Sequence, residues 1–183
     1  MILPIYVYGS GVLRKEAVAV EQDHAGLAEL VQNMFETMHH ADGVGLAAPQ
    51  VGLPLQLFVV DASAFAEDDP SLADFRRVFI NSEILSFEGD NVSFDEGCLS
   101  LPGINEKVMR PEGIRIRYYD EFFNAHEEEF HGIVARIVQH EFDHTQGLVF
   151  TDRVGKLRKQ MLQSKLKGMA NGKAKASYPI KVG

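Results

Sequence analysis

The stretch QHEFDHTQG, residues 139–147, constrains the fold of this chain more than any other feature of its sequence. It places His140 and His144 four positions apart, with Glu141 directly after the first histidine. On an α-helix, residues four apart lie one above the other on the same face, so both imidazoles can reach one metal ion. Metal hydrolases use the same HExxH spacing, with the glutamate as a base. The segment therefore predicts a helix that carries a metal site, although the pattern also arises by chance in long helices.

A catalytic metal needs a third protein ligand and one open position. Cys98 is the only cysteine of the chain and lies in DEGCLSLPG, residues 95–103, where a loop after a strand could present its thiolate. A lone cysteine can equally be a small buried apolar residue. His126, His131 and several acidic residues are alternatives, and the sequence pattern alone does not choose among them.

The spacing of apolar residues predicts an α+β order of elements. One helical face covers residues 27–38, with Asp23 as the expected N-cap and an end near 41–43. A second helix over 133–142 carries the opening motif, and a third covers 157–166. Between them lie five strand patterns, of which the last two are expected to pair: 55–61, 77–85, 91–94, 114–120 and 127–132.

Composition indicates an ordinary globular protein. The chain has 183 residues, of which 45% are apolar and 24% charged, enough for one domain with its own core. No apolar run approaches the roughly 18 residues that suggest a membrane span, so no membrane association is expected. The first residues lack the pattern of an export signal, and a single cysteine cannot form an internal disulfide. Both features predict a cytoplasmic protein.

Charge is distributed unevenly along the chain. The net charge is −8, yet residues 156–183 contain eight lysines and arginines and no acidic residue. These cations could simply solvate a terminal helix, or they could contact the phosphates of RNA. A basic helix of this kind could keep the protein at the ribosome.

Three motifs occur in a fixed order: GVGLAAPQ at 43–50, EGCLS at 96–100 and HEFDH at 140–144. Together they resemble the signature motifs of the peptide deformylase family in sequence, order and spacing. The resemblance extends over about residues 1–170 and leaves 171–183 as a basic tail. It implies a compact α+β domain in which antiparallel or mixed strands surround a central metal-binding helix, with a C-terminal helix after it.

The resemblance implies that three residues bind one divalent metal ion: Cys98, His140 and His144. Fe²⁺ is the expected metal, with Zn²⁺, Ni²⁺ or Co²⁺ as alternatives. The implied reaction is removal of the N-formyl group from the initiator methionine of nascent polypeptides, with release of formate. Glu141 would take a proton from the attacking water and return it to the departing amine. Gln50 and the backbone N–H of Leu99 are the expected donors to the oxyanion.

The glycine-rich loop at 43–52 could simply turn the chain, but it could also let a peptide backbone lie alongside as an added strand. Val44, Gly45 and Gly97 are then expected to provide backbone contacts. The methionine side chain needs an apolar pocket, although the same residues could belong to the core. Four residues are expected to line it: Val44, Phe94, Ile133 and Ile137.

Three further residues carry expectations of their own. Asn105 stands where many bacterial members of the family have an arginine near the peptide backbone, which leaves recognition of that backbone open. Arg136 lies one helical turn before His140 and is expected to extend across the rim of the pocket. Asp143 lies off the helix face that carries the two histidines, and we expect it to pair with Arg110.

Two other functions compete with this interpretation. A metallopeptidase would use the same HExxH chemistry, but it usually takes its third ligand further along the chain. Beyond His144 the only acidic residue is Asp152, and no histidine follows. A metal-stabilised binding module would need four protein ligands and would give Glu141 no task.

Overall fold

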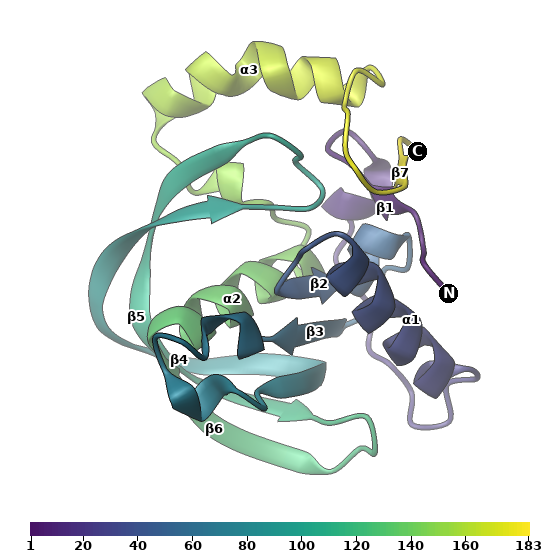
Figure 1. Cartoon of the computed structure of the whole chain (residues 1–183), viewed down its shortest axis with the longest axis vertical. Coiled ribbons are helices and arrows are strands. Elements are labelled where there is room, and N and C mark those ends of the chain that lie inside the picture. The colour runs from purple at the N-terminus through teal and green to yellow at the C-terminus, as the bar shows by residue number, and fades with distance from the viewer.

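A five-stranded antiparallel sheet in the order β2–β3–β4–β5–β6 forms the centre of the molecule (Figure 1). The computed structural model describes all residues from 1 to 183. The strands of this sheet are β2 (Gly45–Ala47), β3 (Leu57–Asp61), β4 (Arg76–Gly97), β5 (Asn105–Tyr119) and β6 (Ala125–His131). A second, parallel pair consists of β1 (Ile5–Tyr6) and β7 (Ile180–Lys181).

Three α-helices accompany the sheets: α1 (Leu27–His40), α2 (Gly132–Thr145) and α3 (Lys156–Ala170). Short 3₁₀ helices occupy Gly11–Arg14, Ala48–Val51, Ser63–Phe65, Pro70–Leu72 and Phe150–Asp152. This order of elements confirms the α+β prediction, with one long helix before the main strands and two after them. None of these helices combines the length and the apolar character needed to cross a membrane.

Helix α2 is the central helix, as predicted. Eleven of its fourteen residues are buried, which is typical of a helix enclosed on all sides rather than lying on a surface. Its Val134, Ile137 and Val138 belong to the same apolar cluster as Phe58 and Phe79 of the sheet. The curved ribbons of β4 and β5 wrap around it in Figure 1. The motif helix is therefore held in place by the core of the protein.

The prediction of two separate strands at 77–85 and 91–94 was wrong, because both belong to the 22-residue strand β4. Pairing with β5 continues throughout, but its register shifts three times. Asn81 and Gly89 adopt left-handed backbone conformations at two of these shifts, with φ of 50° and 71°. Such bulges bend a strand without ending it. The polar residues 88–91, which join the two predicted strands, therefore form a bend within β4.

The N-cap of α1 was also predicted at the wrong residue. The helix begins after Gly26, whose φ of 75° is in the left-handed region that glycine adopts without strain, and Asp23 is not the cap. Its last residue is His40, which agrees with the predicted end near 41–43.

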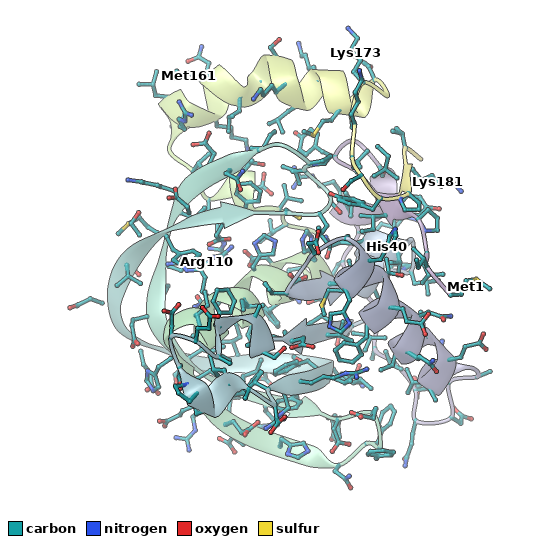
Figure 2. The ribbon with its side chains drawn as sticks, viewed as in Figure 1. Met1, His40, Arg110, Met161, Lys173 and Lys181 are labelled. Carbon is teal, nitrogen blue, oxygen red and sulfur yellow. The ribbon has the colours of Figure 1, made fainter.

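The apolar spacing over 157–166 predicted helix α3, but only some of those apolar residues are buried. Leu162 and Leu166 are buried against Leu101, Val108 and Phe150, whereas Leu157 and Met161 are 73% and 65% exposed. Figure 2 shows Met161 and Lys173 at the outer surface around this helix. A helix that packs against the protein along one side buries only a narrow stripe of its residues. Tertiary contacts decide which apolar residues lie in that stripe.

The C-terminal residues return to the start of the chain. Backbone hydrogen bonds run from Ile5 N to Pro179 O at 2.9 Å and from Val7 N to Lys181 O at 3.0 Å. In Figure 1 the yellow segment after α3 descends to lie beside β1. The division into a domain at 1–170 and a tail at 171–183 stays a prediction, but the last residues are paired with the body of the protein.

The packing of α3 can be tested by a matched pair of substitutions. Leu166→Ala removes a side chain that is 4% exposed and should lower the free energy of unfolding by about 2–4 kcal/mol. Leu157→Ala changes an exposed position of the same helix and should alter it by less than about 0.5 kcal/mol. Urea unfolding followed by circular dichroism measures both values. Equal losses in the two variants would contradict this packing.

Candidate metal centre and active site

Cys98, His140 and His144 converge at one buried point. Cys98 follows the end of β4, and the two histidines lie one turn apart on α2, so the predicted helical spacing brings both imidazoles to the thiol. Candidate ligand atoms of the three residues all lie within 4.8 Å of one another. The distance from Cys98 Sγ to His144 Nε2 is 3.3 Å. The other two histidines considered as a third ligand are paired with acidic residues instead: His126 with Asp120 and His131 with Glu112.

This donor set fits a single divalent cation. One thiolate and two imidazoles suit iron and zinc, and three protein ligands leave a position open for catalysis. Glu141 Oε2 lies beside these ligands, is buried and has no hydrogen-bond donor in the protein. A buried carboxylate oxygen without a donor is available to accept a hydrogen bond from a water or substrate at the open coordination position of the metal. Burial raises the pKa of Glu141 to about 7, which suits a group that takes and returns a proton.

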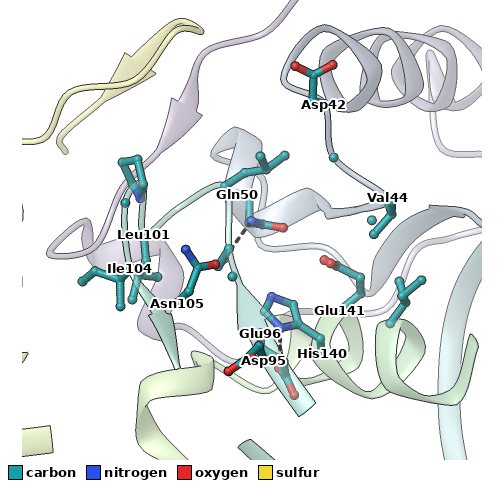
Figure 3. A pocket seen from close by; sticks show the side chains of 18 of the residues that line it. Asp42, Val44, Gln50, Asp95, Glu96, Leu101, Ile104, Asn105, His140 and Glu141 are labelled. Atoms are coloured by element: carbon teal, nitrogen blue, oxygen red, sulfur yellow. Dashed lines mark hydrogen bonds and ion pairs between the residues drawn. The ribbon is translucent and has the colours of Figure 1, made fainter. Parts of the chain in front are cut away.

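Glu96 orients the first histidine. Its Oε1 lies 2.8 Å from His140 Nδ1, which leaves the Nε2 atom of that ring for a metal (Figure 3). Burial alone would raise the pKa of Glu96, but hydrogen bonds from His140 and Arg110 lower it far below its usual range. The residue is therefore a carboxylate at neutral pH, and it holds the imidazole by charge as well as by geometry.

Arg110 connects the loop of Cys98 to the metal helix. From β5 its Nε and Nη2 donate to Glu96 at 2.7 and 3.0 Å, and its Nη1 donates to Asp143 of α2 at 2.8 Å. The predicted pairing of Arg110 with Asp143 is thus confirmed. Arg153 binds the same aspartate from the solvent side, with Nη2 at 2.6 Å from Oδ1. The carboxylates of Glu96 and Asp143 are therefore both paired with arginines in this region.

Arg136 does not extend across the rim, so that prediction was wrong. It is 5% exposed, and its guanidinium donates to Glu96 at 2.8 Å and to the carbonyls of Val108 and Val92 at 3.0 and 2.7 Å. Its charge is therefore paired and its donors satisfied within the protein, which makes burial acceptable. The guanidinium also lies 5.6 Å from the centre of the Phe94 ring, on one side of the pocket.

A pocket of about 530 Å³ opens onto Cys98 and His140, two of the three candidate metal ligands (Figure 3). Every residue predicted to contact the substrate lines it: Val44, Gly45, Phe94, Gly97, Ile133 and Ile137. The predicted catalytic residues Gln50, Leu99 and Glu141 lie on the same walls. The roles of these residues toward a substrate stay predictions, but the sequence motifs do meet around one cavity.

The two predicted oxyanion donors are held differently. Gln50 is buried, and its Oε1 accepts a hydrogen bond from Ala47 N at 2.8 Å, which fixes the orientation of its amide. Its Nε2 then donates to Ser100 Oγ at 3.1 Å and faces Cys98 Sγ at 3.5 Å. The backbone N–H of Leu99 donates to no acceptor within the protein. It is therefore free to bind a substrate oxygen.

Gly45 lies so close to the predicted base Glu141 that a side chain at this position would clash with it. A Cβ atom at this position would lie 2.5 Å from Glu141 Oε1, closer than real Cβ contacts occur. Glycine therefore lets the edge of β2 approach the carboxylate. Because β2 pairs only with β3, its other edge is open to an additional strand.

Several lining residues escaped the sequence analysis. The C-terminal residues Lys175, Ala176, Ser177 and Tyr178 form part of the pocket wall. No local signal marks SYPI as a site segment, because only the return of the chain to β1 brings it there. Asn105, which stands where many bacterial members of the family have an arginine, lies against Gly97. A Cβ atom on that glycine would be 2.6 Å from Asn105 Oδ1.

Comparison with known proteins decides the family. The model of the polypeptide deformylase family matches residues 2–160. The chain belongs to this family. A peptide deformylase of Flavobacterium psychrophilum is 47% identical over 100% of this chain and 97% of that protein. One of Salinibacter ruber is 48% identical over 98% of this chain and 94% of that protein.

Solved structures agree with the family assignment. The peptide deformylase of Thermus thermophilus is similar with a TM-score of 0.83 and 40% identity, over 94% of this chain and 99% of that one. That of Legionella pneumophila has a TM-score of 0.82 and 36% identity, over 96% and 99%. Peptide deformylases are metal-dependent hydrolases that remove the N-formyl group from nascent polypeptides, and this is the activity of the chain. Family membership decides against the metallopeptidase and the binding module.

The buried ion pairs of this deformylase predict a large effect at Arg110. Arg110→Met leaves the carboxylates of Glu96 and Asp143 buried with fewer partners and should lower the free energy of unfolding by about 3–5 kcal/mol. Arg115→Met is the matched control, because its pair with Glu127 is exposed and should contribute less than about 1 kcal/mol. Urea unfolding of both variants provides the comparison. A loss at Arg110 as small as the loss at Arg115 would refute the structural role of this network.

Proposed function

We propose that Cys98, His140 and His144 hold one divalent metal ion and that Glu141 is the general base of deformylation. The observation that carries this proposal is the convergence of the three ligands beside a buried glutamate oxygen that has no partner. A divalent ion bound there would supply Lewis acidity and a water molecule of lowered pKa. All other parts of the reaction depend on the side chains and backbone of the chain.

Glu141 accepts one proton from the attacking water at its free Oε2. Oxygen then bonds to the formyl carbon and the carbon–nitrogen bond breaks. The same carboxyl returns the proton to the departing amine, so formate and a peptide with a free N-terminus leave. Gln50 Nε2 and the Leu99 N–H donate to the oxygen on which negative charge develops. Ser100 Oγ takes one Nε2 hydrogen at 3.1 Å, and the other, which faces Cys98 Sγ at 3.5 Å, is the one assigned to the oxyanion. The bond from Ala47 N supports this role, because it fixes the orientation of the amide before the charge forms.

The substrate backbone would lie along the open edge of β2. Val44, Gly45 and Gly97 offer backbone groups on the pocket walls, as an added strand requires. The methionine side chain would enter between the apolar residues of the same pocket. These are Val44, Phe94, Ile133 and Ile137. Arg136 does not oppose an apolar ligand there, because Glu96 already neutralises its charge.

We also propose Fe²⁺ as the metal, with Zn²⁺, Ni²⁺ or Co²⁺ able to replace it. A cysteine thiolate and two histidines form a ligand set that all of these ions accept. A cytoplasmic location would suit such a centre, because Cys98 must remain reduced to bind a metal as a thiolate.

The central test is formate release from a formyl-methionyl peptide by protein purified without oxygen, with metal content determined on the same sample. Formate should appear with close to one metal per chain. Glu141→Gln should keep the metal and lower the rate by about 10²–10⁴-fold, because the base is lost but the ligands are not. Cys98→Ala should lose both metal and activity. Normal turnover by Glu141→Gln, or full metal content in Cys98→Ala, would overturn the assigned roles.

A second proposal is that α3 binds ribosomal RNA and so keeps the enzyme near nascent chains. Lys156, Lys165 and Lys167 are exposed and form no ion pair within the protein, whereas Arg158 and Lys159 are paired with acids. Unpaired cations on one helix are suited to phosphate contacts.

Replacing the three unpaired lysines of α3 by glutamine should weaken co-sedimentation with ribosomes. The dependence of log K on log salt should become shallower by about 0.7–0.9 for each phosphate that is no longer neutralised. Arg115 and Arg117 on the β5–β6 hairpin, changed to glutamine, provide the control and should leave binding unaltered. Formate release should be normal in both variants. Unchanged ribosome binding by the lysine variant would rule this proposal out.

A further inference from the structure

The segment that precedes β7 contributes to the active site without belonging to its motifs. Tyr178 lies two residues before β7 and lines the pocket, and its ring packs against the apolar cluster around α1. The pairing of β7 with β1 fixes the position of this segment, as Figure 1 shows. These residues also lie beyond residue 160, where the match to the family model ends. The sequence motifs therefore do not include these residues, and their role at the active site follows from their contacts.

The hydroxyl of Tyr178 donates to the backbone carbonyl of Leu99 at 2.8 Å. No other group of the protein donates to that carbonyl. Burial raises the pKa of Tyr178 to about 12, so the phenol keeps its proton at neutral pH. The bond therefore acts on the one residue whose free N–H we assign to the oxyanion.

The residues on either side of Leu99 are also held by hydrogen bonds. Leu101 N donates to Cys98 O at 2.9 Å, and Tyr8 N donates to Ser100 O at 2.8 Å. Gln50 Nε2 contacts Ser100 Oγ at 3.1 Å. The Leu99 N–H shares its peptide plane with the Cys98 carbonyl, which Leu101 N holds. The Leu99 carbonyl lies in the next plane, at the centre of the turn from Cys98 to Leu101, and Tyr178 is its only donor. Without Tyr178 this second plane would be free to move, and the turn that places the Leu99 N–H would lose one of its fixed contacts.

We propose that Tyr178 is a positioning residue for deformylation, which holds the Leu99 backbone so that its N–H stays directed at the substrate oxygen. The inference rests on the role proposed above for Leu99. It assigns to the C-terminal segment a function in turnover, in addition to its packing. Small displacements of a catalytic group are costly, since a misplacement of about 1 Å can lower a rate by about 10²-fold.

The test is Tyr178→Phe, which removes the hydroxyl and keeps the ring. Its kcat for formate release should fall by about three- to thirty-fold, which corresponds to the loss of one hydrogen bond to a positioned group. KM, metal content and thermal unfolding should change little, because binding of the peptide, the ligands and the packing are retained. In zinc-loaded protein the amide resonance of Leu99 should shift relative to the wild type, because the turn that carries it is held less firmly.

Tyr119→Phe is the matched control, since this tyrosine is exposed at the end of β5 and its hydroxyl has no hydrogen-bond partner. It should behave as the wild type in every measurement. Tyr178→Leu adds a packing variant, in which stability falls together with kcat.

Four results would overturn the inference. One is an unchanged kcat in Tyr178→Phe, even if Tyr178→Leu is impaired, because the ring alone would then account for the effect. The others are an unchanged amide resonance of Leu99, a lower kcat explained by lost metal, and an equal loss in Tyr119→Phe. If the wild type with bound metal released no formate, the proposed function itself would fail, and this outcome is distinct because it does not involve Tyr178.

Discussion

The buried carboxylate of Glu96 is the interaction on which the rest of the site depends. It accepts hydrogen bonds from Arg110 of β5 and from Arg136 and His140 of α2, so it joins three elements at one point. A carboxylate without such donors would be expensive to bury, and here the donors outweigh the cost of desolvation. Because Glu96 stands two residues before Cys98, the contacts that orient the imidazole also fix where the thiol can lie.

The long curved pair of strands β4 and β5 carries Glu96 and Arg110 and so positions this interaction. The bulges at Asn81 and Gly89 let β4 bend while it remains paired, so its end reaches the metal helix instead of continuing past it. Phe94 and Gly97 then form one wall of the pocket, and the open edge of β2 forms another. Cys98 and His140, two of the proposed metal ligands, line the pocket between these walls.

Much of the site could be predicted because its chemistry depends on local spacing. A separation of four residues suffices to bring His140 and His144 together once the segment is a helix, and the apolar stripe of that segment predicts the helix. The pairing of Asp143 with Arg110 was predictable for a related reason, since an acid off the ligand face needs a partner when its helix is buried. Arg136 was misjudged because its acceptors lie on β4 and β5, which the sequence does not place around it.

The sequence by itself determined the family, the order of the three helices, the strands around 57–61, 114–119 and 127–131, the metal ligands expected on α2 and the loop after β4, and the predicted base. These properties reside in periodicity and short motifs, which act over a few residues. Only the tertiary structure decided that β4 is one bent strand, that α3 buries Leu162 and Leu166 but not Leu157, and that Tyr178 reaches Leu99. Each of these depends on contacts between residues far apart in the chain, whose free energy is set by packing and by buried hydrogen bonds rather than by local preference.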